Sequence, residues 1–511
     1  MSAMNANFAF NDLFILDLAN NHQGDLEHGL DIVAGVGAVI RKQGVRGAFK
    51  FQFRALETFI HPDYKAQKGV KHISRFMETA LGRDDYATLV AAVRQAGMIP
   101  ICTPFDEASV ELIADLGIDI IKVASCSADD MPLLECVAAS RKPVVVSTGG
   151  LNLEKIDRLV SLLEYKGAQF ALMHCVALYP TPNDKLNLNQ IETLRSRYPH
   201  VPVGFSTHEF PDNLMAVQLA YAKGARLFER HVGRNTERYK LNAYSSSPEQ
   251  LDAWIDSWHQ ARTACGGEHR PPATPDELAS LRSLARGVFS TGAIAKGRSI
   301  TRDDVFFAMP LHEGQLKSAE WHDGMVADRD YAPLEPLTET LADPTPSENQ
   351  LLYHILLQVK GILNNARIHI SRDHSFEISH HYGLLRFREF GAVIINCINR
   401  VYCKKLIVQL PRQKHPYHYH KVKEETFQLL HGDLEIFLDG NSHQLKPGDI
   451  FLVEPNKWHK FHTLHGAVFE EVSTTHYDND SYYEDETIAR LPREKRKTVI
   501  PSWDAMLDTR R

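Results

Sequence analysis

Short apolar runs alternate with stretches of helical period over the first 260 residues. The apolar runs are FILDL (14–18), GAFKFQF (47–53), MIPICTP (98–104), IDIIKVAS (118–125), KPVVVST (142–148), FALMHC (170–175), VPVGFS (201–206) and ARLFERH (225–231). Strands that are joined by helical crossovers run parallel, so eight such units predict a closed (β/α)8 TIM barrel. A doubly wound open sheet is the alternative, but no GxGxxG motif follows the first run.

Polar residues stand at the C-terminal end of nearly every predicted strand. They are Asp17, Lys50, Gln52, Thr103, Lys122, Ser125, Ser147, His174, Ser206, His208, Glu229 and His231. A strand that served only the core has no reason to end in this way, although any single member could be a cap or a core residue. Since barrels of this kind build their active sites from the strand C-termini, the group predicts a catalytic site there.

The rest of the chain divides at polar, proline-bearing stretches. The barrel is assigned to residues 1–268, and this boundary falls within the polar stretch GGEHRPPATPDE (266–277). A small unit of short strands and turns follows at 278–342. Beyond ADPTPSEN (342–349), a linker helix is predicted at 343–365, a β-rich block at 366–478 and a charged, irregular C-terminal tail at 479–511. Glycine turns at 439–440 and 447–448 fit hairpins, and the block predicts an all-β jelly roll.

The β-rich block contains the run HPYHYHKVKEETFQLLHG (415–432). His418 and His420 are two residues apart, so on a strand both side chains face the same side. Glu425 follows, and a later run supplies His459. Three histidines and one carboxylate suit Mn, Fe, Ni, Co or Zn, with one or two coordination positions left open.

The two histidine runs resemble the motifs of the cupin family, HxHx4Ex6G and PGDxxxxxP…H, except that Lys457 stands near the place of a usual glycine. The resemblance implies a metal site formed by His418, His420, Glu425 and His459, and the alternative is a cupin that has lost its metal. Cupins include isomerases, epimerases and dioxygenases as well as sugar-sensing or oligomerising modules, so the fold alone does not choose a function.

Composition narrows the class of protein. The chain has 511 residues, 43% of them hydrophobic and 24% charged, with a net charge of -7, which argues against a nucleic-acid surface. The basic run at 493–497 is interpreted as a solvated tail, with an anion-binding patch as the alternative. The N-terminus has no basic n-region, and no segment has the roughly 18 apolar residues of a membrane span. Seven scattered cysteines without a CxxC pair fit reduced thiols in a cytoplasm.

A family resemblance covers residues 12–340. Nine strings occur in order: LDLANNHQGD (16–25), FKFQ (49–52), CTPFD (102–106), IKVAS (121–125), STGG (147–150), HCVALYPTP (174–182), NLNQIETL (187–194), GFSTHEF (204–210) and FERHV (228–232). Together they resemble the sialic acid (N-acetylneuraminate) synthase family, and residues 278–342 look like its small antifreeze-like domain. The resemblance implies that phosphoenolpyruvate condenses with an aldose, usually an N-acylated hexosamine, to give a 3-deoxy-2-ulosonic acid and phosphate.

The resemblance also assigns roles to residues. Lys50 and Lys122 would supply charge for phosphoenolpyruvate, and hydroxyls would come from Thr103, Ser125, Ser147 and Ser206. His208 and His231 match the family's metal pair, which implies Mn2+ or Mg2+ acting as a Lewis acid. Asp17 stands where the family usually has glutamate and would orient the acceptor or assist proton transfer. Further substrate-binding candidates are Asn20, Gln52 and Tyr179, with His22 a weaker one. The structural alternatives are that the two lysines only form a buried ion pair and that the two histidines are hydrogen-bonded core residues.

Several positions depart from the family pattern. Thr207 and the pair Leu241-Asn242 replace acidic or histidine positions, Met309 replaces an arginine, and Ala177 replaces an asparagine or serine. The donor side is kept while the acceptor side drifts, so we expect the same donor with an unusual acceptor; a degenerate barrel is the alternative. The antifreeze-like domain would cap a neighbouring barrel in a homodimer. Two other functions stay open: a Schiff-base aldolase using Lys50 or Lys122, and a non-catalytic sugar-binding protein with the cupin as reader.

Overall fold

The structure is a computed structural model that describes residues 8–65, 70–267, 270–341, 348–371 and 374–502. Two compact units, Met1–Pro272 and Ala273–Arg511, divide the chain. The division falls within the polar, proline-bearing stretch that the sequence marks as a boundary.

The first unit is built on a closed parallel barrel. Among the residues described, its strands follow the order β1 (Leu13–Asp17), β2 (Arg46–Phe53), β3 (Ile99–Pro104), β4 (Ile120–Val123), β5 (Val144–Ser147), β6 (Phe170–Cys175), β7 (Val203–Thr207) and β8 (Leu227–His231). The sheet closes where β1 pairs with β8, which sets Asp17 opposite Lys50 on one side and His231 on the other. The predicted (β/α)8 barrel is therefore confirmed, and the open sheet is excluded.

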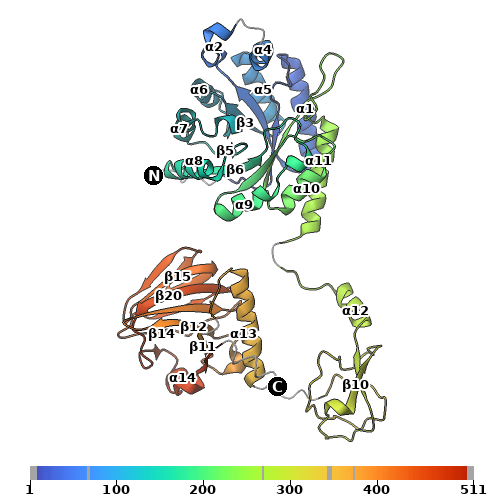
Figure 1. Cartoon of the computed structure of the whole chain (residues 1–511), viewed down its shortest axis with the longest axis vertical. Coiled ribbons are helices and arrows are strands. Elements are labelled where there is room, and N and C mark those ends of the chain that lie inside the picture. The colour runs from blue at the N-terminus through green and yellow to red at the C-terminus, as the bar shows by residue number, and fades with distance from the viewer. Residues whose placement is uncertain (1–7, 66–69, 268–269, 342–347, 372–373, 503–511) are drawn as a thin grey trace. The chain divides into compact units, whose positions relative to one another are not determined.

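Helices surround the strands on the outside (Figure 1). They are α1 (Leu26–Gln43), α5 (Arg83–Gln95), α6 (Glu107–Asp115), α7 (Met131–Ala139), α8 (Leu153–Tyr165), α9 (Asn189–Arg197), α10 (Met215–Ala222) and α11 (Pro248–Cys265). Their apolar faces and the outward side chains of the strands form one core, in which Phe14 packs edge-on against Trp254 of α11. Burial of this apolar surface stabilises the barrel and leaves its strand ends free to carry polar groups.

Three short helices lie in the long connection between β2 and α5. They are α2 (Leu56–Phe59), α3 (Pro62–Lys65) and α4 (Lys71–Glu78). This connection leaves β2 at its C-terminal end, and Arg75 of α4 donates a hydrogen bond to the backbone oxygen of Asn20, which follows β1. The connection therefore lies at the end of the barrel where an active site is expected.

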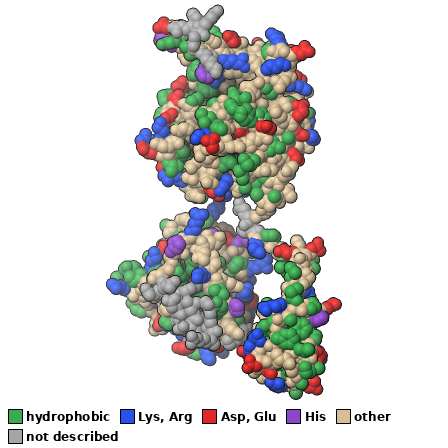
Figure 2. Space-filling model, turned by 45° about the vertical axis from the view of Figure 1, so that its right-hand side comes forward, with side chains coloured by type: hydrophobic (Ala, Val, Ile, Leu, Met, Phe, Trp, Pro, Cys, Tyr) green, Lys and Arg blue, Asp and Glu red, His purple; other side chains and the backbone are tan. Residues whose placement is uncertain are grey.

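The small unit of the second half is built mostly from turns. It contains α12 (Pro275–Ser283), β9 (Gly287–Ser290) and β10 (Val305–Ala308), with the two strands paired antiparallel. Its own core includes Val288, Ile300 and Leu337. Leu278, Leu281 and Leu284 leave 56%, 57% and 69% of their surface exposed along α12, and Figure 2 shows hydrophobic side chains on this part of the molecule.

The β-rich block, called the cupin block below after the family that its motifs resemble, is a sandwich of two antiparallel sheets. One has the order β18 (Ile450–Val453), β15 (Glu425–Gly432), β20 (Ala467–Thr474), β13 (Tyr402–Gln409), β12 (Ala392–Asn399), β11 (Ser375–Ser379) and β22 (Lys497–Ile500). The other has the order β17 (Asn441–Leu445), β16 (Leu434–Leu438), β19 (His459–His462), β14 (His418–Tyr419) and β21 (Tyr482–Tyr483). Two facing sheets of this kind are the expected jelly-roll architecture.

The predicted linker helix is part of the cupin block. It forms α13 (Glu348–Asn365), and residues 343–347 of the predicted element lie outside the described residues. Ile355, Leu356 and Val359 are buried in one cluster with Phe376 and Val393 of the sheet, and α13 runs along the sandwich in Figure 1. A helix with an apolar stripe packs that stripe against a neighbouring sheet. The prediction of a linker did not include this packing.

The predicted irregular tail is also folded up to residue 502. It forms β21, α14 (Glu486–Ala489) and β22, and β22 extends the larger sheet by pairing with β11. Arg493 and Lys497, interpreted from the sequence as solvated, form ion pairs of 3.0 and 2.6 Å with the buried carboxylate of Glu377. The interpretation as a solvated run was therefore wrong for these two residues. The local sequence could not indicate their acidic partner, because Glu377 lies more than a hundred residues away in the chain. Residues 503–511 lie outside the described part.

Candidate functional site

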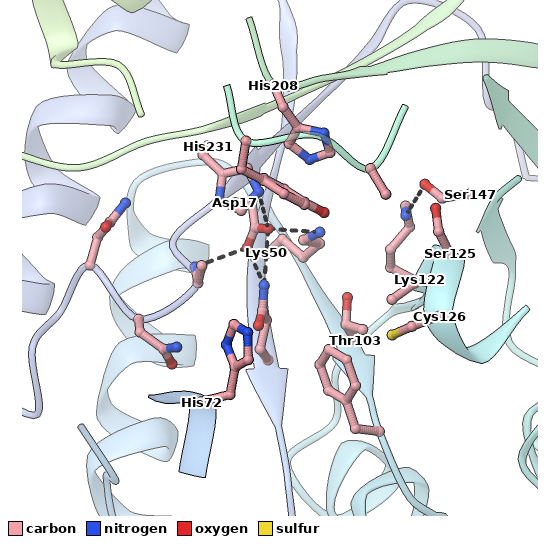
Figure 3. A pocket seen from close by; sticks show the side chains of 18 of the residues that line it. Asp17, Lys50, His72, Thr103, Lys122, Ser125, Cys126, Ser147, His208 and His231 are labelled. Atoms are coloured by element: carbon pink, nitrogen blue, oxygen red, sulfur yellow. Dashed lines mark hydrogen bonds and ion pairs between the residues drawn. The ribbon is translucent and has the colours of Figure 1, made fainter. Parts of the chain in front are cut away.

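A cavity of about 1000 Å³ opens at the C-terminal ends of the barrel strands (Figure 3). The predicted barrel residues that line it are Asp17, Asn20, Lys50, Gln52, Thr103, Lys122, Ser125, Ser147, Tyr179, Ser206, His208 and His231. The structure thus brings together the barrel residues proposed from the sequence as catalytic or substrate-binding, except the weaker candidate His22. His22 and His174 are buried elsewhere and are not among the lining residues.

Asp17 is the centre of the polar network. Its carboxylate lies 2.9 Å from Nζ of Lys50 and 3.3 Å from Nε2 of His231. It also accepts hydrogen bonds from the Gln52 amide, at 3.1 Å, and from the backbone N–H of Ala19, at 2.9 Å. Asp17 is 1% exposed, so these contacts hold a buried carboxylate in one orientation between the lysine and the histidine.

Glu229 joins the two lysines. They come from β2 and β4, and the carboxylate of Glu229 on β8 contacts Nζ of Lys50 through one oxygen and Nζ of Lys122, at 3.3 Å, through the other. Although burial opposes charging, the carboxylates of Asp17 and Glu229 raise the pKa of Lys50. Burial dominates at Lys122 and lowers its pKa despite Glu229. The alternative that the two lysines form buried ion pairs thus agrees with the geometry, but these ion pairs also line the cavity.

Hydroxyl groups surround the Lys122 end of the cavity. The Lys122 ammonium donates to Oγ of Ser147 at 2.6 Å, and Ser125 Oγ accepts from the backbone N–H of Gly149 at 3.1 Å. Among the described residues, the buried hydroxyl of Thr103 has no hydrogen-bond partner. A buried hydroxyl without a partner costs free energy, so a bound ligand oxygen is a natural partner for it.

His208 and His231 fit a divalent metal. Their ring centroids lie 5.3 Å apart, and burial lowers the pKa of His208 to about 3 and also lowers that of His231, which keeps both rings neutral. Nδ1 of His208 donates to the backbone oxygen of Val176 at 3.1 Å, which leaves Nε2 as the ligand atom. Nδ1 of His231 is buried and finds no hydrogen-bond partner in the described ranges, and the nearby Asp17 carboxylate offers oxygen.

The positions that depart from the family pattern lie in different places. Ala177 and Asn242 line the cavity, so their side chains bear on what it accepts. Thr207 is buried, and its hydroxyl has no hydrogen-bond partner in the part of the chain that is described. Leu241 is not among the described residues that line the cavity. Met309 belongs to the second unit and is 55% exposed.

Sequence reasoning missed several lining residues. Glu229 was recognised only as a polar strand end, although its place in FERHV, two residues before His231, was a usable signal. The others include Arg54, His72, Arg75, Cys126 and Tyr244. Tyr244 packs on His231, with ring centroids 5.2 Å apart. Apart from Glu229, these residues lie in the connections that follow β2, β4 and β8, some of them on the short helix α4. The strand pattern does not indicate which side chains of such connections turn inward.

The second site lies between the two sheets of the cupin block. His418, His420 and His459 are buried, and their ligand atoms lie within 4.8 Å of one another. Nδ1 of His418 donates to the Pro416 oxygen and Nδ1 of His459 to the Lys457 oxygen, each at 3.1 Å, while His420 Nδ1 contacts the Asp480 oxygen. These bonds fix the tautomer that leaves all three Nε2 atoms facing inward, as histidine metal ligands require.

Glu425 completes the cupin site and carries its own counter-ion. Its oxygens lie 3.4 Å from Nε2 of His420 and 3.1 Å from Nε2 of His459. Oε2 of Glu425 and Nε2 of His459 are buried, and neither has a hydrogen-bond partner within the described part of the chain, so the donor set fits a cation. On its other side Glu425 contacts the buried ammonium of Lys423, which also lies 2.6 Å from Glu471.

Other histidines of the block lie outside this ligand set. His415 is buried and packs on His418 with ring centroids 4.7 Å apart, and its Nε2 lies 3.2 Å from that of His381. His431 contacts Asn365, and His462 pairs with Glu435 at 2.9 Å. His415 therefore supports a ligand, whereas His431 and His462 are peripheral. In the part of the chain that the structure describes, no helix is long and apolar enough to cross a membrane.

Comparison with known proteins supports both predicted resemblances. A family model described as the NeuB family matches residues 41–270, and a cupin domain model matches residues 406–470. An uncharacterised protein of Methanocaldococcus jannaschii is 30% identical over 293 residues, which is 57% of this chain and 82% of that protein. The N-acetylneuraminate-9-phosphate synthase of Drosophila melanogaster is 31% identical over 246 residues, 47% of this chain and 65% of that enzyme.

A solved structure is also similar. It is a provisionally named spore coat polysaccharide biosynthesis protein E from Chromobacterium violaceum, 44% identical, with a TM-score of 0.63 over 65% of this chain and 100% of that one. These matches confirm the predicted family and the cupin fusion, and the name of the Drosophila relative agrees with the expected class of condensing transferase. The chain belongs to the NeuB family, the family of the sialic acid synthases, and carries a C-terminal cupin domain.

Proposed function

We propose that the barrel condenses phosphoenolpyruvate with an aldose, forming a sialic-acid-like 3-deoxy-2-ulosonic acid and phosphate. The observation that carries the proposal is the convergence of Lys50, Lys122, Asp17 and the His208–His231 pair on one cavity. Family membership supports it, because relatives of similar sequence are named as N-acetylneuraminate-9-phosphate, legionaminic acid and pseudaminic acid synthases.

The phosphoenolpyruvate end of the cavity would lie around Lys122. Its ammonium and the hydroxyls of Ser147, Ser125 and Thr103 offer charge-assisted and neutral hydrogen bonds to phosphate and carboxylate oxygens. Lys50 extends the positive charge toward Asp17. Because Glu229 contacts both ammonium groups, it fixes their spacing before any substrate arrives.

The acceptor would lie on the Asp17 side, next to Gln52 and Asn20. C3 of phosphoenolpyruvate attacks the aldehyde carbon, the carbonyl π electrons move to its oxygen, and that oxygen takes a proton. A divalent ion held by His208 and His231 would supply Lewis-acid polarisation of the aldehyde. Asp17 orients the acceptor and stands ready to move a proton, since its carboxylate contacts both Lys50 and His231.

The second half of the reaction uses water. Attack by C3 leaves a cationic centre at C2 that still bears the phosphate, and one water adds there. The C2–O bond to phosphate then breaks, so the ketone forms and inorganic phosphate leaves. Phosphoenolpyruvate, aldose and water are consumed and the ulosonic acid and phosphate are produced, with no oxidant or reductant needed.

The cupin would act as an accessory centre in the same scheme. His418, His420, His459 and Glu425 would hold a divalent metal (Mn, Fe, Ni, Co or Zn) with one or two positions open to a sugar, for isomerisation or for binding. The antifreeze-like unit would cap the barrel of a second copy in a homodimer, which the exposed leucines of α12 support. A cytoplasmic location stays a prediction.

A Schiff-base aldolase is the second candidate, because burial lowers the pKa of Lys122 and so favours a neutral amine. Borohydride trapping of a carbonyl substrate on Lys122, combined with insensitivity to a chelator, would support it. The main proposal predicts no trapping and loss of turnover when the divalent metal is removed. A non-catalytic sugar-binding protein would bind ligand without releasing phosphate.

The test of the proposed function is phosphate release from phosphoenolpyruvate by the full chain, with Mn2+ or Mg2+ and a panel of aldoses. Release that depends on both the aldose and the metal is the expected result. If no aldose in the panel gives phosphate, the synthase proposal is wrong.

A further inference from the structure

Two arginines line the cavity without a carboxylate partner. Arg54 directly follows β2, and Arg75 lies on α4. In the part of the chain that the structure describes, neither guanidinium forms a salt bridge; Arg54 donates to Oε1 of Gln52 at 3.1 Å and Arg75 to the backbone oxygen of Asn20 at 3.2 Å. By contrast, the deeper Lys50 and Lys122 are already paired with Asp17 and Glu229.

Arg54 is held in place by aromatic rings. Its guanidinium lies 4.0 Å from the ring centroid of Phe76 on α4 and 3.6 Å from that of Phe105, which follows β3. Stacking against two rings restricts the side chain without using its N–H groups. Nε of Arg54 is buried and has no hydrogen-bond partner among the residues that the structure describes. A fixed guanidinium with an unsatisfied buried donor is preorganised for an anionic acceptor atom.

The charges around the two arginines leave a positive excess. Burial lowers the pKa of Arg54 to about 10, so the group remains a cation at neutral pH. Glu78, at the end of α4, lines the same cavity and offsets one of the two guanidinium charges. His72, also on α4, lines the same cavity and is labelled in Figure 3.

The position of Arg54 places this charge near the cavity mouth. Lys50, Gln52 and Arg54 alternate along the chain, and a strand rises about 3.3 Å per residue, so Arg54 begins roughly 13 Å beyond Lys50. Gln52 connects the two levels, because its Nε2 donates to Asp17 while its Oε1 accepts from Arg54. Both arginines thus contact the residues, Gln52 and Asn20, that are proposed to bind the acceptor.

We propose that the acceptor sugar carries an anionic group, a phosphate or a carboxylate, at the end remote from its aldehyde, and that Arg54 and Arg75 bind this group. The inference rests on the proposed function and names its substrate class. A neutral aldose would leave the unsatisfied donor of Arg54 buried under the substrate. An anion held at the mouth would set the aldehyde end toward Asp17 and the histidine pair.

The test compares each neutral acceptor with a counterpart that carries an anionic group at C6. Phosphate release by the full chain is measured with N-acetylmannosamine against its 6-phosphate, mannose against its 6-phosphate, and glucose against glucuronic acid. An anionic acceptor is expected to exceed its neutral counterpart in kcat/KM by about 10-fold or more. Whether the phosphates or the uronic acid respond identifies the group. If the neutral sugars are turned over as well as the anionic ones, the inference is wrong while the proposed function stands.

Variants locate the effect. Arg54→Gln and, independently, the less enclosed Arg75→Gln are expected to raise the KM of the anionic acceptor about 10-fold and leave the KM of phosphoenolpyruvate within about twofold. Arg158→Gln, on the exposed face of α8, is the matched control and should change neither. A rise in the KM of phosphoenolpyruvate instead would assign Arg54 to the donor and overturn the inference. Thermal unfolding of each variant separates lost binding from lost folding.

Discussion

Nζ of Lys122 on β4 lies 3.3 Å from Oε2 of Glu229 on β8, across the inside of the barrel. The other oxygen of Glu229 contacts Lys50 on β2. One buried carboxylate therefore positions two lysines from different strands. Burying these charges costs desolvation free energy, and such a cost is typical of a site that binds an anionic substrate.

Replacing Glu229 by Gln should lower kcat/KM by about 100-fold or more and reduce stability by roughly 3 kcal/mol, because Lys122 would lose its buried counter-charge. Phosphate release and thermal unfolding measure the two effects. Glu154→Gln, an exposed residue of α8, is the control and should leave both nearly unchanged. Wild-type turnover in Glu229→Gln would show that the lysines need no common anion.

The two candidate metal centres should be separable. His208→Ala removes a barrel ligand and is expected to lower phosphate release by about 100-fold or more, whereas His418→Ala should lower the metal bound by the cupin and leave barrel turnover within about threefold. Metal content is measured by mass spectrometry on the full chain. If only His418→Ala abolished turnover, the carbon–carbon bond would have been assigned to the wrong domain.

Lys423 should control how far the cupin depends on metal. Its ammonium contacts Glu425 and lies 2.6 Å from Glu471, so Lys423→Gln removes the cation between two buried carboxylates. Glu471 keeps Lys405 at 3.6 Å, whereas Glu425 loses its lysine partner. The metal-free variant is expected to unfold at a lower temperature, and added Mn2+ or Zn2+ should raise its Tm more than that of the wild type, since metal then supplies the missing positive charge.

The control for Lys423 is Lys421→Gln, whose ammonium lies over the ring of Tyr482 instead. An equal response of both variants to metal would mean that Lys423 does not neutralise the site.

Acid should loosen the cupin through Glu377. Although burial opposes its ionisation, Lys497, Lys405 and Arg493 lower the pKa of Glu377 from 4.5 to about 2. A carboxyl whose folded-state pKa is lowered contributes stability that is present above pH 4.5 and is lost as the pH falls toward 2. We expect Glu377→Gln to be less stable at pH 7 and to show a shallower loss between those values, measured by calorimetry of the full chain. Identical slopes for wild type and variant would contradict this account.

Much of the candidate site could be predicted because it follows the strand pattern. Parallel strands with polar C-terminal ends must gather those ends on one face of a barrel, so Asp17, Lys50 and His208 were expected together. His418 and His420 were predictable for a similar reason, since alternation along a strand puts both on one face. The fold of the tail was not predictable, because Glu377 and Lys497 meet through pairing between distant strands.

The sequence by itself determined the barrel, the polar ring at its strand ends and the histidine set of the cupin. These features follow from the strand and helix periods of polar and apolar residues, which can be recognised within short segments of the chain. Only the tertiary structure decided which charges meet. Glu229 between two lysines, Lys423 between Glu425 and Glu471, and Arg54 between two aromatic rings all depend on contacts between segments far apart in the chain. Electrostatic character depends on burial and on neighbours in space, and a linear pattern records neither.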